Sequence, residues 1–334
     1  MKAIILLSGG LDSTLAAEIM NRNGLELVAV NYKTPFCLCD SHSKGGGCAS
    51  NARRVTDALG IELRMINATD DFLQVLRDPK HGYGANMNPC IDCRILFFKK
   101  SKAIMAEVGA SFVITGEVLG QRPMSQHKRQ LAIIEKESGL EELVVRPLSE
   151  KLLPPTIPER NGWINREGLL SIEGRSRKQQ ISIAKELGVK DYPCAAGGCL
   201  LTYSGFAKKI KDLISHDELD LSNIHLLRSG RYFRLSKQAK LIIGRNEQDN
   251  AVLERLAQDG DHIFYPSNIN GPFALGRGLF SHELIELSCG IVARYCDRDG
   301  QREAEVCYRK HSDAKASAMV VSALSDVEIN KRRI

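Results

Sequence analysis

The sequence lacks any long apolar run. No hydrophobic stretch among its 334 residues approaches the length that crosses a bilayer, and no basic segment stands ahead of such a stretch at the N-terminus. We therefore expect a cytoplasmic protein with no membrane partner. Internal repeats and low-complexity tracts are also missing, so we expect ordinary globular folding.

The sequence also has little excess of one charge sign over the other. The net charge is only +6, with 43% hydrophobic and 26% charged residues, which is the composition of a soluble protein with a sizeable core. The length favours two domains, which we place at residues 1–220 and 221–334.

Apolar runs and amphipathic segments alternate through the first domain. The expected strands are 3–7, 25–30, 61–66, 111–115 and 143–145, and the expected helices are 12–22, 49–59, 92–108 and 176–187. Such alternation predicts an α/β fold with a doubly wound parallel sheet, whose ligands bind beyond the carboxyl ends of the strands. A connector helix is expected at 208–214. Beyond it, period-two patterns at 232–243 and 304–308 predict a smaller α+β domain.

A glycine loop directly follows the first apolar run, with the sequence Ser-Gly-Gly-Leu-Asp-Ser-Thr over residues 8–14. A strand that breaks at two glycines and re-enters a helix exposes backbone N–H groups to an anion. The hydroxyls of Ser8, Ser13 and Thr14 add donors. No Gly-Lys-Ser/Thr follows, so the loop is not the one that grips the terminal phosphates for γ-transfer.

Ten cysteines in a chain without a secretory signal favour metal or thiol chemistry over disulfides. Cys90 and Cys93 open a helix that carries Lys99, Lys100 and Lys102, a setting in which we expect the thiolate to be favoured. A second pair, Cys194 and Cys199, follows at a distance. Cys289, Cys296 and Cys307 alternate with apolar residues, which indicates that they are packing residues.

Positive charge is concentrated between residues 226 and 245, which hold no acidic residue. The cations are Arg228, Arg231, Arg234, Lys237, Lys240 and Arg245, with Tyr232 and Phe233 among them. Cations with interleaved rings suit RNA, although a solvated basic face is an equal interpretation of this segment alone.

Several motifs of the first 200 residues resemble those of the PP-loop ATP pyrophosphatases, and in particular the tRNA thiouridine synthases. These motifs are the glycine loop, Asn-Pro-Cys-x-x-Cys at 88–93, Thr-Gly-Glu-Val-Leu-Gly-Gln at 115–121 and the cysteines after the helix at 176–187. The 115–121 string is most similar to the 4-thiouridine synthases, and the 88–93 string to the tRNA 2-thiouridylases. The resemblance implies an enzyme with the fold of the adenine nucleotide alpha hydrolases.

The resemblance also implies roles for individual residues. ATP and Mg²⁺ are implied as cofactors, with Asp12 holding Mg²⁺ and pyrophosphate, and Cys90 and Cys199 handling sulfur. The implied ATP-binding residues are Ser8, Gly9, Gly10, Asp12, Ser13, Thr14, Gly116, Glu117 and Gln121. Some members of this group bind a [4Fe-4S] cluster through three cysteines, which here correspond to Cys90, Cys93 and Cys199, with Cys194 as the competitor of Cys199.

A third group of cysteines suggests a separate metal site. Cys37, Cys39 and Cys48, in a glycine-rich loop with His42, form a set that suits Zn²⁺ or part of a cluster. A loop without metal is the alternative.

The second half resembles the RNA-binding domain of NFACT proteins. The resemblance lies in residues 233–250, which include Gly-Arg-Asn-Glu-Gln-Asp-Asn at 244–250, followed by Gly-Pro at 271–272 and a helix-like segment at 281–296. The expected RNA-binding residues are Arg231, Arg234, Lys240, Arg245 and Asn246. The alternative is a structural turn in which Asn250 caps the next helix.

Taken together, these resemblances imply a transferase of tRNA modification. By that resemblance we expect ATP to adenylate a uridine carbonyl, and sulfur from sulfide or a persulfide carrier such as a cysteine desulfurase to replace the oxygen. Two alternatives stay open: adenylation of a small molecule or cofactor, and a non-catalytic RNA-binding accessory factor.

Overall fold

The computed structural model describes residues 1–38, 47–189, 198–297 and 300–334, and the side chains of residues 47 and 48 are outside this description. The chain divides into two compact units, Met1–Thr202 and Tyr203–Ile334. The sequence placed the boundary between residues 220 and 221, which is too late. Residues 203–220 belong to the second unit because carboxylates on them pair with cations of its sheet, as Asp212 does with Arg234.

The first unit is built on five strands. They are β1 (Lys2–Leu6), β2 (Glu26–Lys33), β3 (Glu62–Asn67), β4 (Phe112–Thr115) and β5 (Val144–Val145). Its helices are α1 (Leu11–Arg22), α3 (Gly47–Leu59), α4 (Thr69–Arg77), α5 (Cys90–Val108), α6 (Lys128–Ser138), α7 (Ile157–Arg160) and α8 (Lys178–Glu186). Short 3₁₀ turns cover Glu150–Leu152, Arg166–Gly168 and Leu200–Thr202.

All pairings in this first sheet are parallel, in the order β3-β2-β1-β4-β5. The predicted doubly wound sheet is thus confirmed. The strand order reverses between β1 and β4, and ligands of such sheets bind at this switch point, beyond the carboxyl ends of the strands. The glycine loop after β1 and the 115–121 segment after β4 both start there.

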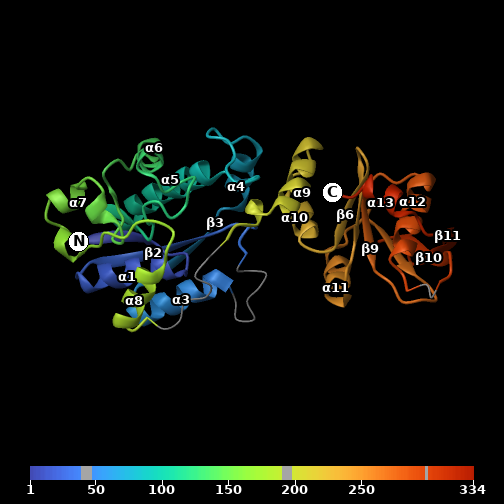
Figure 1. Ribbon diagram of the computed structural model, residues 1–334, viewed down its shortest axis with the longest axis horizontal. Coiled ribbons are helices and arrows are strands. Elements are labelled where there is room, and N and C mark those ends of the chain that lie inside the picture. Colours follow the sequence, from blue (N-terminus) through green and yellow to red (C-terminus); the bar gives the residue numbers. More distant parts are fainter. Residues whose placement is uncertain (39–46, 190–197, 298–299) are drawn as a thin grey trace. The chain divides into compact units, whose positions relative to one another are not determined.

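Helices cover both faces of this sheet, with α5 and α6 on one side and α1, α3 and α8 on the other (Figure 1). The alternation within β1 explains the two cores. Ala3 and Ile5 pack with α1 and α8, whereas Ile4 and Leu6 pack with α5. The proline-rich segment 147–158 forms an irregular path along the unit, with one 3₁₀ turn and the start of α7.

The second unit begins with α9 (Ser204–Ser215) and α10 (Leu221–Leu227). Its strands are β6 (Arg231–Ser236), β7 (Ala239–Ile243), β8 (His262–Pro266), β9 (Ala274–Gly278), β10 (Glu303–Lys310) and β11 (Ser317–Ser322). The remaining helices are α11 (Glu247–Leu256), α12 (His282–Arg294) and α13 (Asp326–Asn330).

These six strands form one antiparallel sheet in the order β11-β10-β8-β9-β7-β6. Helix α12 packs on it, and its Cys289 and Ile291 share a core with Phe233 and Phe264. The predicted α+β domain is confirmed, with β6 and β7 in the 232–243 pattern and β10 in the 304–308 pattern. Helices of the described segments fall short of the length and apolarity that a membrane crossing needs.

Candidate functional site

The glycine loop connects β1 to α1 at the carboxyl edge of the parallel sheet. Gly9 has a φ of 76°, which glycine adopts without strain. Ser13 Oγ donates to the Gly10 carbonyl (3.0 Å) and lies 3.1 Å from Ser8 Oγ. Within this loop, all of which the structure describes, no side chain caps α1. The first amides of the helix are therefore available to an anion, as predicted from the motif.

Gly116 brings the loop after β4 against this loop. A Cβ on Gly116 would lie 2.5 Å from the carbonyl carbon of Asp12 and from the Ser13 nitrogen. Contacts this short with backbone atoms require something to move. Glycine at this position therefore lets the two loops of the switch point touch.

Asp12, in the first turn of α1, is held by an amide and a guanidinium. Gln121 Nε2 donates to its Oδ2 at 2.7 Å, and Arg177 Nη2 lies 3.7 Å from the same oxygen. Gln180 in turn orients Gln121 through a 3.1 Å hydrogen bond. The other carboxylate oxygen, Oδ1, is buried without a hydrogen-bond partner among the described residues. An orphaned carboxylate oxygen beside an anion cradle fits a Mg²⁺ ligand.

A pocket of about 140 Å³ opens between these loops. Six of the predicted ATP-binding residues line it: Ser8, Gly10, Asp12, Ser13, Gly116 and Gln121. One wall is apolar, with Tyr32 stacked on Phe97 at 4.6 Å between ring centroids. Three arginines line it as well, Arg94, Arg122 and Arg177. Gly9 and Thr14 are buried behind the lining.

Glu117 does not line this pocket, contrary to the expectation from the sequence. Its carboxylate is 1% exposed and lies between Arg94 Nε and Arg146 Nε, each at 3.1 Å. Burial would raise the pKa of Glu117, but the charges of the two arginines outweigh burial and hold it below the usual range. Glu117 thus fixes Arg94 at the pocket wall and is a positioning residue.

The cysteines come together from three segments. Cys37 forms a β-bridge with Cys199, because Leu200 N–H donates to Phe36 O (2.9 Å) and Leu38 N–H donates to Gly198 O (3.2 Å). The segment before α5 joins them, since Met87 N–H donates to Leu201 O at 3.2 Å. Cys90 and Cys93 lie in the first turn of α5, close enough to Cys199 to interact with it electrostatically.

The thiols do not favour the thiolate, so this prediction is wrong. Burial raises the pKa of Cys90, and it raises the pKa of Cys93 and of Cys199 to about 12. Burial outweighs the charges of Arg122 and Arg94, which lower the pKa of Cys90. Lys100, one of the expected helix cations, pairs instead with Asp71 at 2.7 Å.

Metal sites are the least supported part of the expectation. Among the described residues, no three histidine, cysteine or carboxylate side chains converge as metal ligands. Cys39, His42 and Cys194 lie outside the described residues, as does the side chain of Cys48. Cys37, which the sequence assigned to a separate set with Cys39 and Cys48, lies beside Cys199.

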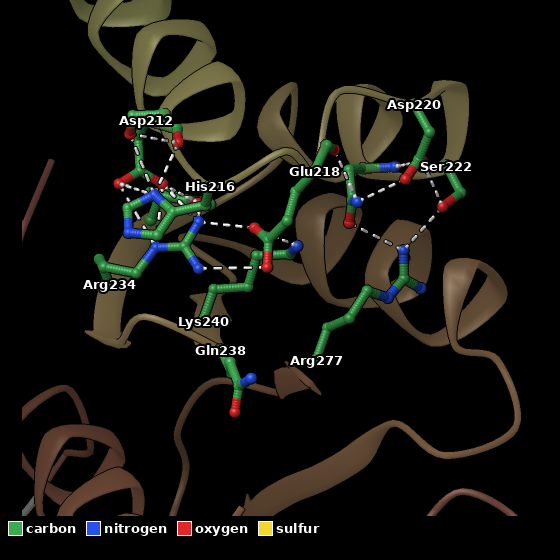
Figure 2. Close-up of polar contacts among 12 residues, drawn as sticks. Asp212, His216, Glu218, Asp220, Ser222, Arg234, Gln238, Lys240 and Arg277 are labelled. Atoms are coloured by element: carbon green, nitrogen blue, oxygen red, sulfur yellow. Dashed lines mark hydrogen bonds and ion pairs between the residues drawn. The ribbon is translucent and has the colours of Figure 1, made fainter. Parts of the chain in front are cut away.

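Two of the expected RNA-binding residues are buried in a polar network of the second unit (Figure 2). Arg234 Nη2 lies 2.6 Å from both Asp212 Oδ2 and Glu218 Oε2, and Lys240 Nζ lies 2.8 Å from Glu218 Oε2. The Lys240 side chain is 3% exposed. Arg234 and Lys240 are therefore structural residues, not the exposed RNA contacts that the sequence predicted.

The other three lie at the corner where β6, β7 and α11 meet. Arg231 Nη1 donates to Gly244 O at 3.2 Å, and its guanidinium lies 4.4 Å from the Tyr295 ring centroid. Arg245 is half exposed and pairs with Asp249 at 2.6 Å. Asn246 caps α11 by accepting the Asp249 N–H. The cap is thus Asn246 and not Asn250, whose side chain accepts the Phe273 N–H.

Two family models match this chain, one in each unit. Residues 1–151 match "Thiamine biosynthesis protein (ThiI)", and residues 230–333 match "NFACT protein RNA binding domain". The first unit is thus similar to ThiI over most of its length, and the second unit is similar to the NFACT RNA-binding domain. The resemblances stated from the motifs are thereby confirmed.

Curated relatives of the first unit are named tRNA-specific 2-thiouridylase MnmA. The relative from Methylobacterium nodulans is 27% identical over 138 residues, 39% of this chain and 36% of that protein. The relative from Methylorubrum extorquens is 24% identical over 224 residues, 64% of this chain and 54% of that protein. The chain thus spans about a third to a half of the length of these relatives.

A solved complex of a 4-thiouridine synthetase with RNA and bound ATP is similar at 22% identity and a TM-score of 0.40, over 64% of this chain and 50% of that one. The C-terminal part of a fibronectin/fibrinogen-binding protein from Streptococcus suis is similar at 12% identity and a TM-score of 0.29, over 47% of this chain and 72% of that one. At these scores neither likeness carries an argument.

Sequence reasoning missed several residues of the first unit's pocket. Arg94 and Arg122 each follow a recognised motif directly, after Cys93 and Gln121, and that adjacency was the available signal. No signal marked Arg177, which reaches Asp12 from the segment before α8. In the second unit, the prediction that Cys289 and Cys296 are packing residues is confirmed by their burial.

Proposed function

We propose that this chain is an ATP-dependent tRNA sulfurtransferase that makes thiouridine. The observation that carries the proposal is the position of Arg94 and Arg122. Both line the pocket at the glycine loop, and the charges of both act on Cys90. The described cysteines do not line the pocket themselves, but these two pocket arginines lie close enough to Cys90 to act on it electrostatically.

The first step that this geometry supports is adenylation. The uracil carbonyl oxygen attacks the α-phosphorus of ATP, the bond between that phosphorus and the bridging oxygen breaks, and pyrophosphate leaves. The free amides of α1 would hold the pyrophosphate. Mg²⁺ bound at Asp12 Oδ1 would neutralise part of its charge.

The second step exchanges oxygen for sulfur. A sulfur nucleophile adds to the activated carbon, and the carbon–oxygen bond breaks as AMP leaves with the former carbonyl oxygen. Sulfide suits this step without any reductant, because sulfur enters and stays at the same oxidation state. Arg94 and Arg122 would stabilise the negative charge that the phosphate of AMP gains.

We assign the handling of sulfur to Cys90 and Cys199, with Cys93 beside them. These three thiols interact electrostatically with one another. They do not converge as metal ligands in the described structure, so a [4Fe-4S] cluster held by three cysteines would require these side chains to move together. Such a cluster, when bound, would supply an iron site for sulfide. The chain's own contribution is to bring the two segments together through the Met87–Leu201 and Asn86–Thr202 hydrogen bonds.

The test is a thiolation assay with purified full-length protein under anaerobic conditions. Unmodified tRNA, ATP, Mg²⁺ and sulfide should yield thiouridine in nucleoside mass spectrometry, together with AMP and pyrophosphate in equal amounts. Iron and acid-labile sulfide are measured on the same preparation.

The control separates this function from adenylation of a small molecule. Pyrophosphate release is measured with and without tRNA, and tRNA should stimulate it at least about tenfold. Release that ignores tRNA, with no thionucleoside formed by a preparation that contains its iron, would contradict the proposal.

A further inference from the structure

Helix α9 lies ahead of the residues that match the NFACT model, yet it belongs to the second unit. Ala207, Ile210 and Leu213 form its buried face. The rest of the helix carries three lysines, Lys208, Lys209 and Lys211. Lys208 and Lys211 are exposed, whereas Lys209 is half buried and turned toward α10.

Lys209 is held at the end of α10. Its Nζ donates at 3.2 Å to the carbonyl oxygen of Leu227, and Leu227 is the last residue of that helix. The carbonyl end of a helix carries partial negative charge, so it orients the ammonium group but does not neutralise it. Two arginines of other elements, Arg245 and Arg333, lie close enough to act on its charge.

Arg245 and Arg333 both belong to the β6 edge of the sheet. Arg333 forms a β-bridge with Phe233 of β6, and its side chain is exposed. Arg245 follows β7, the partner of β6, and its guanidinium is fixed by Asp249 through Nε and Nη2. Asp249 Oδ2 also accepts the N–H groups of Gly230 and Arg245, so its charge is shared among several donors.

We propose that Lys209, Arg245 and Arg333 form a binding site for the phosphodiester backbone of RNA, with Lys209 as the central contact. The assignment rests on the proposed function only in taking RNA as the partner. We call these three residues the cationic corner. Its central residue lies outside the NFACT match, so the RNA site is a composite of that domain and the preceding helix.

The positive charges of the cationic corner repel one another, and a bound polyanion would offset this repulsion. Burial, together with Arg245 and Arg333, lowers the pKa of Lys209 to about 8, and Asp249 opposes this shift only in part. Asp249 forms its ion pair with Arg245, so among the described residues the corner keeps an excess of positive charge. A phosphate would stabilise the charged lysine, and exposed Arg245 and Arg333 are available to the same strand.

The first experiment measures tRNA binding against salt concentration, with full-length protein. Lys209→Met is compared with Lys211→Met, a matched control on the same helix. Losing one phosphate contact should lower the slope of log K against log salt by about 0.7 to 0.9 and weaken binding several-fold at each salt concentration. Lys211→Met should keep the wild-type slope. Thermal melting of both variants checks folding.

The second experiment uses pH. Wild-type affinity should fall about fourfold from pH 7 to pH 8.5, because Lys209 loses its proton in the free protein across this range and RNA raises its pKa. Lys209→Arg keeps the charge throughout, so its affinity should be flat over the same range. This variant also keeps the test independent of folding defects in Lys209→Met.

The outcomes separate this inference from the proposed function. Wild-type protein that does not bind tRNA would overturn both. Tight binding with identical slopes for Lys209→Met and Lys211→Met, or a pH response that persists in Lys209→Arg, would overturn the cationic corner and leave the sulfurtransferase proposal standing.

Discussion

Cys90 and Cys199 come from distant segments of the chain, and we assign both thiols to the same sulfur-transfer reaction. The sequence marked both cysteines but misjudged their environment. A helix N-terminus and nearby lysines suggested a stabilised thiolate, whereas burial dominates and raises both pKa values. Burial depends on how distant segments pack, and no local pattern in the sequence reports it.

Replacing either sulfur should stop thiolation and spare nucleotide binding. We expect Cys90→Ser and Cys199→Ser to lower thiouridine formation by at least about 10³-fold, because each variant loses a thiol that handles the incoming sulfur. Equilibrium binding of an ATP analogue should stay within about twofold of wild type. Cys307→Ser, a half-buried cysteine of β10, is the matched control and should keep full activity. Wild-type rates in Cys199→Ser would contradict its role.

Glu150 is a buried carboxyl group that the sequence gave no reason to single out. Its side chain is fully buried, and its Oε2 accepts the Arg146 N–H at 2.5 Å. Burial raises its pKa to about 8; the Arg146 hydrogen bond opposes the shift, and neighbouring Glu159 adds to it. The folded protein therefore keeps a proton that the unfolded chain loses near pH 4.5.

Because the pKa of Glu150 is higher in the folded than in the unfolded protein, the stability of the protein should decrease as pH rises. Between about pH 4.5 and 8 the native state binds the extra proton, so the free energy of unfolding falls as pH rises, by at most about 1.4 kcal/mol per pH unit. Trp163, the only tryptophan, lies in the same unit and reports urea unfolding by fluorescence. Glu150→Gln, which keeps the acceptor oxygen, should remove this slope. An equal slope in both proteins would refute the assignment.

At the level of elements, the sequence predicted the parallel sheet and the position of its ligand edge. The apolar runs sit where β1 to β5 are found. The central strands β1, β2 and β4 are buried on both faces and therefore need continuous apolar sequence, whereas the edge strand β3 is only half-buried. The sequence did not predict α4, α6 or the strands β8, β9 and β11. The half-buried β11 has an irregular pattern of exposure, so period-two alternation does not reveal it.

Gly116, in the loop after β4, lies against the start of α1. Adding a single methyl group at this position should therefore lower ATP affinity strongly. Gly116→Ala places a Cβ 2.5 Å from backbone atoms of Asp12 and Ser13, so the glycine loop must move. We expect ATP affinity, measured by calorimetry, to fall at least about tenfold. Gly205→Ala in α9, where a Cβ meets nothing within 4 Å, should leave affinity unchanged and slightly stabilise the helix. Unchanged ATP affinity in Gly116→Ala would show that the two loops separate easily.

At the scale of the whole molecule, the sequence predicted two domains but misplaced their boundary. The boundary was placed after the expected connector helix at residues 208–214. The decisive contacts join residues far apart in sequence, Asp212 and Glu218 with Arg234 and Lys240, which periodicity cannot report. The same contacts explain why two basic residues of the 226–245 run are not exposed.

The position of the boundary has a direct consequence for fragments of the chain. A fragment of residues 203–334 keeps both carboxylates, whereas residues 221–334 leave Arg234 and Lys240 buried without them and leave the Tyr232 hydroxyl without Asp212. Removing one partner of a buried ion pair costs about 3 to 5 kcal/mol. We expect 203–334 to unfold cooperatively in thermal circular dichroism, and 221–334 to be unfolded or aggregated.

A variant of the longer fragment separates charge from helix packing. Asp212→Asn with Glu218→Gln keeps the shape of α9 and the following loop but removes both charges, and it should lower the melting temperature of 203–334 by most of the difference between the fragments. If the double variant melts like 203–334 itself, then the apolar face of α9, with Ile210 and Leu213, is what anchors residues 203–220 to the sheet. In that case the ion pairs would contribute little to the stability of this unit.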